Sequence, residues 1–337
     1  MKMRIILTVL SAMVMVSFSH VGCAKALEDQ DFSTLLKQAE HGNVRAQFLI
    51  GNKYELGIPY DYAKAVAWYQ KAAKQGDPEA QRSLALMYAE GRGVAQNDVQ
   101  AVSWYRKSAA QEEVVAQYSL GYMYEYGRGV TQDYATAAEW YQKVAERGLA
   151  MAQYSLGALY ENGHGVPQDD NEALKWYQKA AVQDHDNDWA LVKVGEFYRD
   201  GRVVPRDYAK AFALFQKAES YGNAAAAYDI GLAYENKQGV KRDEDIALSW
   251  YKKAAGKDYA PAETKLGTIY WGWQDLDTAI AYLESAVAQG DDVAAYTLGL
   301  IYLEEHSIRR DVHIAANWLR KAASMGNIDA QKKLKKL

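Results

Sequence analysis

Residues 116–143 read AQYSLGYMYEYGRGVTQDYATAAEWYQK, and this stretch decides the fold. The opening Ala, Leu120 and Tyr124 follow one another at intervals of four residues, which places them on one face of a helix. The second half begins at Asp133, a residue type that caps helix N-termini, and continues through Ala137 to an aromatic pair. Glycines separate the two halves and favour the end of a helix there. The stretch therefore predicts two helices joined by a short loop.

The same pattern recurs along nearly the whole chain. Each copy opens with an Ala, which we take as position 1 of that copy: Ala46, Ala80, Ala116, Ala152, Ala190, Ala226, Ala262 and Ala294. The spacing stays near 36 residues, and a fragment of a further copy begins at Ala330. A period of this length without β-rich segments predicts helical hairpins stacked into an α-solenoid.

The positions that stay constant between copies indicate how the two helices of a repeat pack. The Ala four residues after the capping Asp or Asn is the same in all eight copies, which suits a close approach of the helices. Position 6 of the first helix is Gly in seven of eight copies, although Gly costs about 1 kcal/mol in a helix. We expect an aromatic side chain of the second helix to pack across this bare backbone. Position 10, which is often Glu, is predicted to be solvated.

The pattern Ala-x3-Leu-Gly-x2-Tyr-x2-Gly-x-Gly-Val, followed by Asp-x3-Ala-x2-Trp-Tyr-x-Lys-Ala-Ala, resembles the Sel1-like repeat family, a relative of the tetratricopeptide repeats. The resemblance covers about residues 44–329. It implies an all-α fold, a right-handed α-solenoid superhelix of about eight antiparallel helix-turn-helix repeats that serves as an adaptor for other proteins. One branch of the family staples each repeat with a disulfide. This chain has one Cys, so packing alone must hold its repeats together.

The first 26 residues read as a signal peptide, because Lys2 and Arg4 precede a short apolar run. Cleavage after Ala26 would leave a chain without a membrane span. Alternatively, residues 21–23 resemble a lipobox that would place a lipid anchor on Cys23, and an uncleaved anchor is a third reading. We expect export to the periplasm or beyond, or an outer-membrane lipoprotein.

The remaining chain divides into three segments. We predict an N-terminal capping helix in residues 27–43, eight repeats in residues 44–329 and a truncated C-terminal helix in residues 330–337.

Composition and motifs argue against most classes of catalytic, metal-binding and nucleic-acid-binding site. A net charge of −4 argues against nucleic-acid binding, and one Cys excludes a disulfide framework, a Cys-ligated zinc site and an iron–sulfur cluster. Ser249 and Lys252 spell S-x-x-K, the acylating pair of penicillin-binding enzymes, but they occupy ordinary repeat positions. We predict no catalytic residue and no cofactor, and hence no enzyme.

The one metal-like phrase is the alternating Asp of residues 184–188. Trp189 and Gly195 stand where a calcium loop needs Gly and Glu, so we interpret the phrase as an acidic cap. Adventitious Ca²⁺ binding is the alternative, and we predict no built metal site.

Positions that vary between copies are free to bind a partner. Positions 4, 7 and 11 of the first helix vary and share one face, so their side chains would form a continuous stripe along the stack. Apolar and aromatic side chains on a solvated stripe suit an interface. We predict that Tyr122, Tyr126, Leu56 and Leu86 contact a partner; the alternative is packing between repeats.

The seventh repeat has a shortened loop that contains Trp271 and Trp273. These side chains either fill the gap that the missing loop leaves or contact a partner. We include both among the candidate partner-binding residues.

The sequence thus predicts an exported scaffold that binds another protein or a peptide through its concave surface. Envelope signalling, envelope assembly and contact with host proteins are all open as settings. The alternative function is an envelope enzyme or ligand-binding protein that acts on peptidoglycan or β-lactams.

Overall fold

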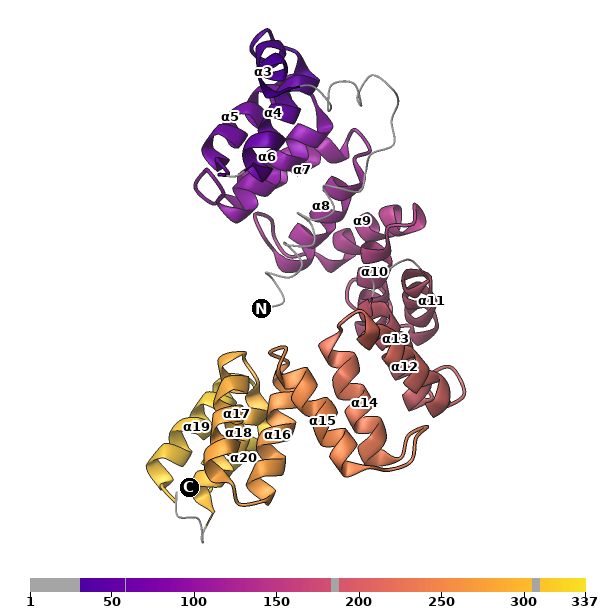
Figure 1. Ribbon diagram of the computed structural model, residues 1–337, viewed down its shortest axis with the longest axis vertical. Coiled ribbons are helices and arrows are strands. Elements are labelled where there is room, and N and C mark those ends of the chain that lie inside the picture. The colour runs from indigo at the N-terminus through magenta and orange to yellow at the C-terminus, as the bar shows by residue number, and fades with distance from the viewer. Residues whose placement is uncertain (1–30, 58, 183–187, 305–309) are drawn as a thin grey trace. The chain divides into compact units, whose positions relative to one another are not determined.

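The computed structural model describes residues 31–57, 59–182, 188–304 and 310–337, and in these residues every regular element is a helix (Figure 1). The predicted all-α repeat fold is confirmed. The predicted signal segment with Cys23 and the acidic residues 184–187 lie outside the described residues. The chain divides into two compact units, Met1–Ala180 and Ala181–Leu337.

Each repeat consists of a helix A followed by a helix B. In the first four repeats these pairs are α4 (Val44–Leu56) with α5 (Tyr62–Lys74), α6 (Pro78–Glu90) with α7 (Asp98–Ala109), α8 (Val114–Tyr126) with α9 (Tyr134–Glu146), and α10 (Ala150–Asn162) with α11 (Asp170–Ala181). In the last four they are α12 (Asp188–Asp200) with α13 (Tyr208–Ser220), α14 (Ala224–Asn236) with α15 (Glu244–Ala255), α16 (Ala260–Gly272) with α17 (Leu276–Ala288), and α18 (Asp292–Leu303) with α19 (Val312–Ser324). Helix α3 (Phe32–Glu40) precedes the first pair, and α20 (Ile328–Leu334) follows the last.

The predicted caps begin and end these helices. Asp133 accepts hydrogen bonds from the backbone N–H groups of Ala135 and Thr136, at 3.0 and 3.1 Å, which satisfies donors that the first turn leaves free. Gly127 ends α8 with φ +64°, a left-handed conformation that glycine adopts without steric cost.

The glycine of helix A lies against an aromatic ring of helix B, as predicted. A Cβ atom placed on Gly121 would lie 2.6 Å from Cε1 of Tyr141, well inside van der Waals contact. Tyr141 is fully buried, and the invariant Ala137 beside it is also fully buried. The glycine therefore lowers the intrinsic stability of helix A but allows a large ring to be buried between the two helices.

A ladder of glutamines connects successive helices in the first unit. At position 2, the amide of Gln81 donates to the carbonyl of Ala73 in α5 at 3.1 Å. Its side-chain oxygen accepts a hydrogen bond from Gln111, which follows α7, at 2.9 Å. One buried amide thus joins the preceding and the following helix B. The same donation to the preceding helix is made by Gln47, Gln117 and Gln153.

The loops after helix A pack on the preceding repeat. Arg128 donates a bidentate pair of hydrogen bonds to Asp98 at the start of α7, and a further bond to the carbonyl of Ala89 at the end of α6. Gly129 has φ +67°, and a Cβ there would lie 2.3 Å from the backbone oxygen of Asp98. Only glycine allows this loop to approach its neighbour so closely.

Candidate interaction surface

The exposed large apolar residues of the predicted stripe lie at position 11, where helix A ends. Leu56 is the last residue of α4 and is 60% exposed; Tyr126 is the last residue of α8 and is 52% exposed. Side chains at a helix terminus extend beyond the packed turns, and the loop that follows leaves these two uncovered. The structure thus places two of the candidate residues where a partner could reach them.

Position 7 is buried in the second and third repeats, so the expected exposure of Leu86 and Tyr122 is wrong. Each of these side chains is only 4% exposed. Tyr122 packs in one apolar cluster with Ala85 and Ala89 of the preceding helix A. A stack of repeats brings neighbouring A helices together, and Leu86 and Tyr122 are buried in that stack rather than open to solvent. The inward ring of Tyr122 contacts the outward ring of Tyr126, with 4.6 Å between ring centroids.

Charged side chains lie at the ends of α4 and α6. The guanidinium of Arg92 lies 2.5 Å from the carboxylate of Glu90 and 3.8 Å from that of Glu55. Arg92 follows α6, so it joins the ends of two consecutive A helices. Burial raises the pKa of Glu90 above its usual range. We call Leu56, Glu90, Arg92 and Tyr126 the helix-end patch. These residues lie at or just after the ends of the A helices of the first, second and third repeats.

The glutamates at position 10 are not the solvated residues that the sequence suggested. Glu125 accepts a hydrogen bond from the hydroxyl of Tyr141 at 2.7 Å, and Glu161 accepts one from Tyr177 at the same distance. Burial raises the pKa of Glu125. The repeats with Glu at position 10 all have Tyr at the facing position of helix B. This co-occurrence in the sequence indicates the hydrogen bond between them, which helix periodicity alone does not predict.

The two tryptophans of the seventh repeat have different surroundings. Trp271 is partly buried, and its indole N–H donates to the carboxylate of Glu304 at 2.9 Å. Trp273 is 60% exposed and meets the ring of Tyr270 edge-on, with 5.3 Å between centroids. Of the two, Trp273 is the one whose surface is open to a partner.

One stripe residue in the second unit is a buried acid. Asp229, at position 4 of α14, accepts a hydrogen bond from Arg199 of α12 at 2.7 Å. Burial raises the pKa of Asp229 to about 7, with the carboxylates of Glu196 and Asp200 contributing, while the Arg199 guanidinium opposes the rise. Neither the burial nor this cross-repeat ion pair could be read from the spacing of the repeats.

The other candidate motifs do not form a catalytic or metal-binding arrangement in the described residues. The hydroxyl of Ser249 donates to the carbonyl of Ile246 in its own helix at 2.7 Å, an ordinary helical arrangement. In the parts of the chain that the structure describes, three or more His, Cys, Asp or Glu side chains nowhere gather as a metal site would require. The described helices also include none with the length and apolar character needed to cross a bilayer.

Tandem helical hairpins with a constant core and variable helix ends define an α-solenoid repeat protein. The chain belongs to the Sel1 repeat family. The family's repeat matches residues 44–77, 78–112, 114–149, 150–185, 190–221, 224–259, 260–291 and 292–327.

Two solved structures resemble the chain closely. A Sel1 repeat protein from Oxalobacter formigenes is 31% identical, with a TM-score of 0.67 over 71% of this chain and 96% of that one. The protein c5321, a protective antigen of uropathogenic Escherichia coli with an SLR fold, is 29% identical, with a TM-score of 0.52 over 91% of this chain and 82% of that one.

Curated relatives match over shorter stretches. The HRD3A component of an ERAD-associated E3 ubiquitin-protein ligase from Arabidopsis thaliana is 39% identical over 69 residues, 20% of this chain. Chitin synthase regulatory factor 3 from Schizosaccharomyces pombe is 33% identical over 121 residues, 34% of this chain. The matches cover only 10% and 13% of those two proteins, so they indicate shared repeats rather than shared whole-protein activities.

Proposed function

We propose that this protein is an exported, non-enzymatic scaffold that binds another protein or a peptide through the ends of its A helices. The observation that carries the proposal is the exposure of Leu56 and Tyr126 at equivalent positions of two repeats, on a fold whose constant residues are used for packing. These side chains, one aliphatic and one aromatic, belong to the first and third repeats, and the Arg92–Glu90 ion pair belongs to the second. Such side chains bury apolar area in an interface at low entropic cost.

Two further points support the proposal. HRD3A, which is similar to part of this chain, is by its name a component of an E3 ubiquitin-protein ligase, and c5321 is by its title a protective antigen. Export rests on residues 1–26, where a charged start precedes a short apolar run. Envelope signalling, envelope assembly and host contact are settings that the partner's identity will distinguish.

The site is tested by a double variant, Leu56→Ala with Tyr126→Ala. We would capture partners on the immobilised wild-type protein from an envelope extract and from host fluid, identify them, and measure affinity for the purified partner. We expect a loss of at least tenfold, on the order of 1 kcal/mol or more for each exposed anchor. Helical content and melting should hold because both side chains are exposed. Tyr122→Ala is unsuitable, since it would open a cavity in the core.

The matched control is Tyr60→Ala with Val99→Ala. Both side chains are 65% exposed, but they lie in the loop after α4 and on α7, a helix B. This variant should bind the partner as the wild type does. Equal losses in both variants would contradict the location of the site, and a protein that retains no partner would contradict the scaffold function.

Export is tested separately by the intact mass of the protein recovered from its producing cell. Cleavage after Ala26 predicts a chain that starts at Leu27, whereas lipidation predicts one that starts at a modified Cys23. A full-length chain that stays in the cytoplasm would refute export and leave the binding proposal standing.

A further inference from the structure

The eight repeats provide an internal comparison at two positions of helix B that lie three residues apart. Six repeats have Trp at one position of this helix and Lys three residues later, and the Lys lies over the indole ring. In the closest pairs the ammonium nitrogen is 3.6 Å from the ring centroid of Trp68 and 3.8 Å from that of Trp104. An ammonium over an aromatic face is held by the negative potential of the ring. These repeats thus supply a cation to their own aromatic side chain.

The seventh repeat departs from this arrangement. Its aromatic residue is Tyr282, and the position that carries Lys in the seven other repeats carries Ser285. The seven lysines are Lys71, Lys107, Lys143, Lys179, Lys217, Lys253 and Lys321. The Tyr282 ring stacks on Tyr270 with 5.8 Å between centroids and an interplanar angle of 13°, which holds it in place. The seventh repeat therefore keeps an ordered aromatic side chain but lacks the lysine of the other repeats.

The same repeat also gains a negative charge. Position 2, which is Gln in the first four repeats, is Glu263 here. Glu263 is only 4% exposed, and it accepts hydrogen bonds from Ser285 at 2.9 Å and Gln289 at 2.7 Å. Both donors are neutral. Burial raises the pKa of Glu263, and the carboxylates of Asp258 and Asp291 add to the rise. A buried carboxylate with neutral partners is stabilised when a cation approaches it.

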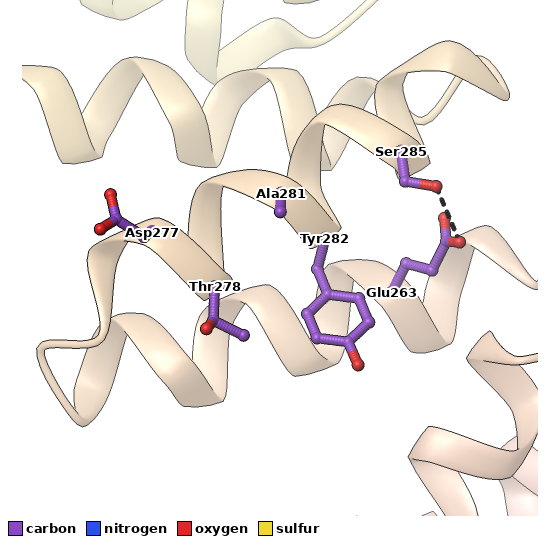
Figure 2. Close-up of a pocket in the computed structure, with 6 residues that line it drawn as sticks. All are labelled: Glu263, Asp277, Thr278, Ala281, Tyr282 and Ser285. Atoms are coloured by element: carbon purple, nitrogen blue, oxygen red, sulfur yellow. Dashed lines mark hydrogen bonds between the residues drawn. The ribbon is translucent and has the colours of Figure 1, made fainter.

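These side chains line one open pocket of about 460 Å³ on α16 and α17 (Figure 2). Its lining residues are Glu263, Asp277, Thr278, Ala281, Tyr282 and Ser285. The lining contains two acidic side chains, an aromatic ring and no basic side chain. Beside it, the exposed Trp273 packs edge-on against Tyr270, which continues the aromatic surface from Tyr282. The pocket thus combines negative charge, an aromatic ring and an adjoining apolar surface.

We propose that this pocket binds the cationic side chain, Lys or Arg, of a partner protein. The partner's ammonium or guanidinium lies against Tyr282 and pairs with Glu263, in the place where seven other repeats carry their own lysine. Trp273 contacts the residues next to that cation. The pocket residues come mainly from a helix B, whereas the helix-end patch lies at the ends of A helices. The site is therefore a second one and does not depend on the helix-end patch.

The test uses Nα-acetyl-arginine amide and Nα-acetyl-lysine amide as probes, titrated into the full chain and followed by two-dimensional amide NMR. We expect saturable shifts confined to α16 and α17, with a dissociation constant in the millimolar range. Nα-acetyl-glutamine amide, which lacks the charge, should give none. Saturable shifts with Mg²⁺ but not with the arginine probe would assign the pocket to a metal ion and overturn the proposal.

Two variants restore residues that other repeats already carry, so both are compatible with the fold. Ser285→Lys places a cation of the chain's own over the ring, and Glu263→Gln removes the buried charge. Each should weaken binding of the arginine probe at least tenfold. The matched control is Lys253→Ser, which changes the equivalent position of the sixth repeat and should leave the shifts in α16 and α17 unchanged. Wild-type affinity in Ser285→Lys would refute the proposal, whatever the helix-end variants do.

Discussion

The two units of the chain differ in how regular their repeats are. In the first unit, position 2 is Gln in every repeat, and the side chain that faces the helix-A position 6 is Tyr in every repeat. In the second unit, position 2 is Leu191, Ala227, Glu263 and Ala295, and the facing side chains are Phe215, Tyr251, Leu283 and Leu319. Both units nevertheless form the same helical hairpins.

The fold therefore does not require the glutamine ladder or the tyrosine hydroxyl. What every repeat keeps is the invariant Ala of helix B and a bulky side chain over position 6. The second unit is therefore where substitutions have introduced new properties, among them the buried carboxylates of Asp229 and Glu263. Substitutions in each unit test this contrast.

The largest effect should come from Asp229→Asn. The pKa of this carboxyl is raised to about 7 by burial, from about 3.9 in an unfolded chain. Between pH 4 and 7 the unfolded chain releases this proton while the folded chain keeps it, so the free energy of unfolding falls as the pH rises. Three pKa units correspond to at most about 4 kcal/mol. Above pH 7 the folded chain bears the full free-energy cost of the buried, ionised carboxylate. The Asn variant has no ionisable group there and does not bear this cost.

Chemical denaturation at pH 4, 5.5 and 8 would measure this dependence. We expect the wild type to lose stability across this range more steeply than Asp229→Asn. The comparison variant, Asp200→Asn, removes a carboxylate that adds to the raised pKa of Asp229 but keeps the buried acid, so its slope should lie between those of the wild type and Asp229→Asn. A slope in Asp229→Asn equal to that of the wild type would contradict the assignment.

Glycine at position 6 should be more sensitive in the first unit than in the second. A Cβ on Gly121 meets the rigid ring of Tyr141, whereas a Cβ on Gly267 meets Leu283, whose side chain can change rotamer. Overpacking costs about 1–3 kcal/mol, part of which the better helix propensity of Ala offsets. We expect Gly121→Ala to lose about 2 kcal/mol and Gly267→Ala less, measured by urea denaturation.

Gly272→Ala is the matched control, because a Cβ there has open space. It should leave the free energy of unfolding unchanged or raise it slightly. If all three substitutions cost the same, the ring packing would not be the reason for the glycine.

The smallest effect concerns a loop. At one loop position the second, third and fourth repeats have Gly93, Gly129 and Gly165 and the sixth has Gly239, whereas the fifth has Val203 with φ +51°. A β-branched residue in this left-handed conformation is strained, because its Cβ branch crowds the backbone. Val203→Gly should therefore raise the free energy of unfolding by about 1 kcal/mol.

Thermal melting of Val203→Gly beside Val204→Gly would check the point. Val204 does not have a positive φ, so its replacement by Gly should lower the melting temperature. A fall in both variants would show that the strain at Val203 is negligible.

Much of the fold could be predicted from local sequence. The helix period, the capping Asp133 and the glycine against Tyr141 all follow from contacts within one repeat, and the structure confirms them. The candidate site could be predicted only in part. Leu56 and Tyr126 are exposed as expected, but Leu86 and Tyr122 are buried. The difference arises because exposure depends on the neighbouring repeat, which a single repeat's periodicity does not represent.

By itself, the sequence determined the repeats, their helices and the residues that every copy shares, because these depend on interactions close along the chain. Only the tertiary structure decided which variable residues are buried, which carboxylates are paired and where the seventh repeat forms a pocket. Those properties arise where residues from different helices meet. Glu263 and Tyr282 depart from the repeat pattern in the sequence, but they become a candidate site only through the packing of α16 against α17.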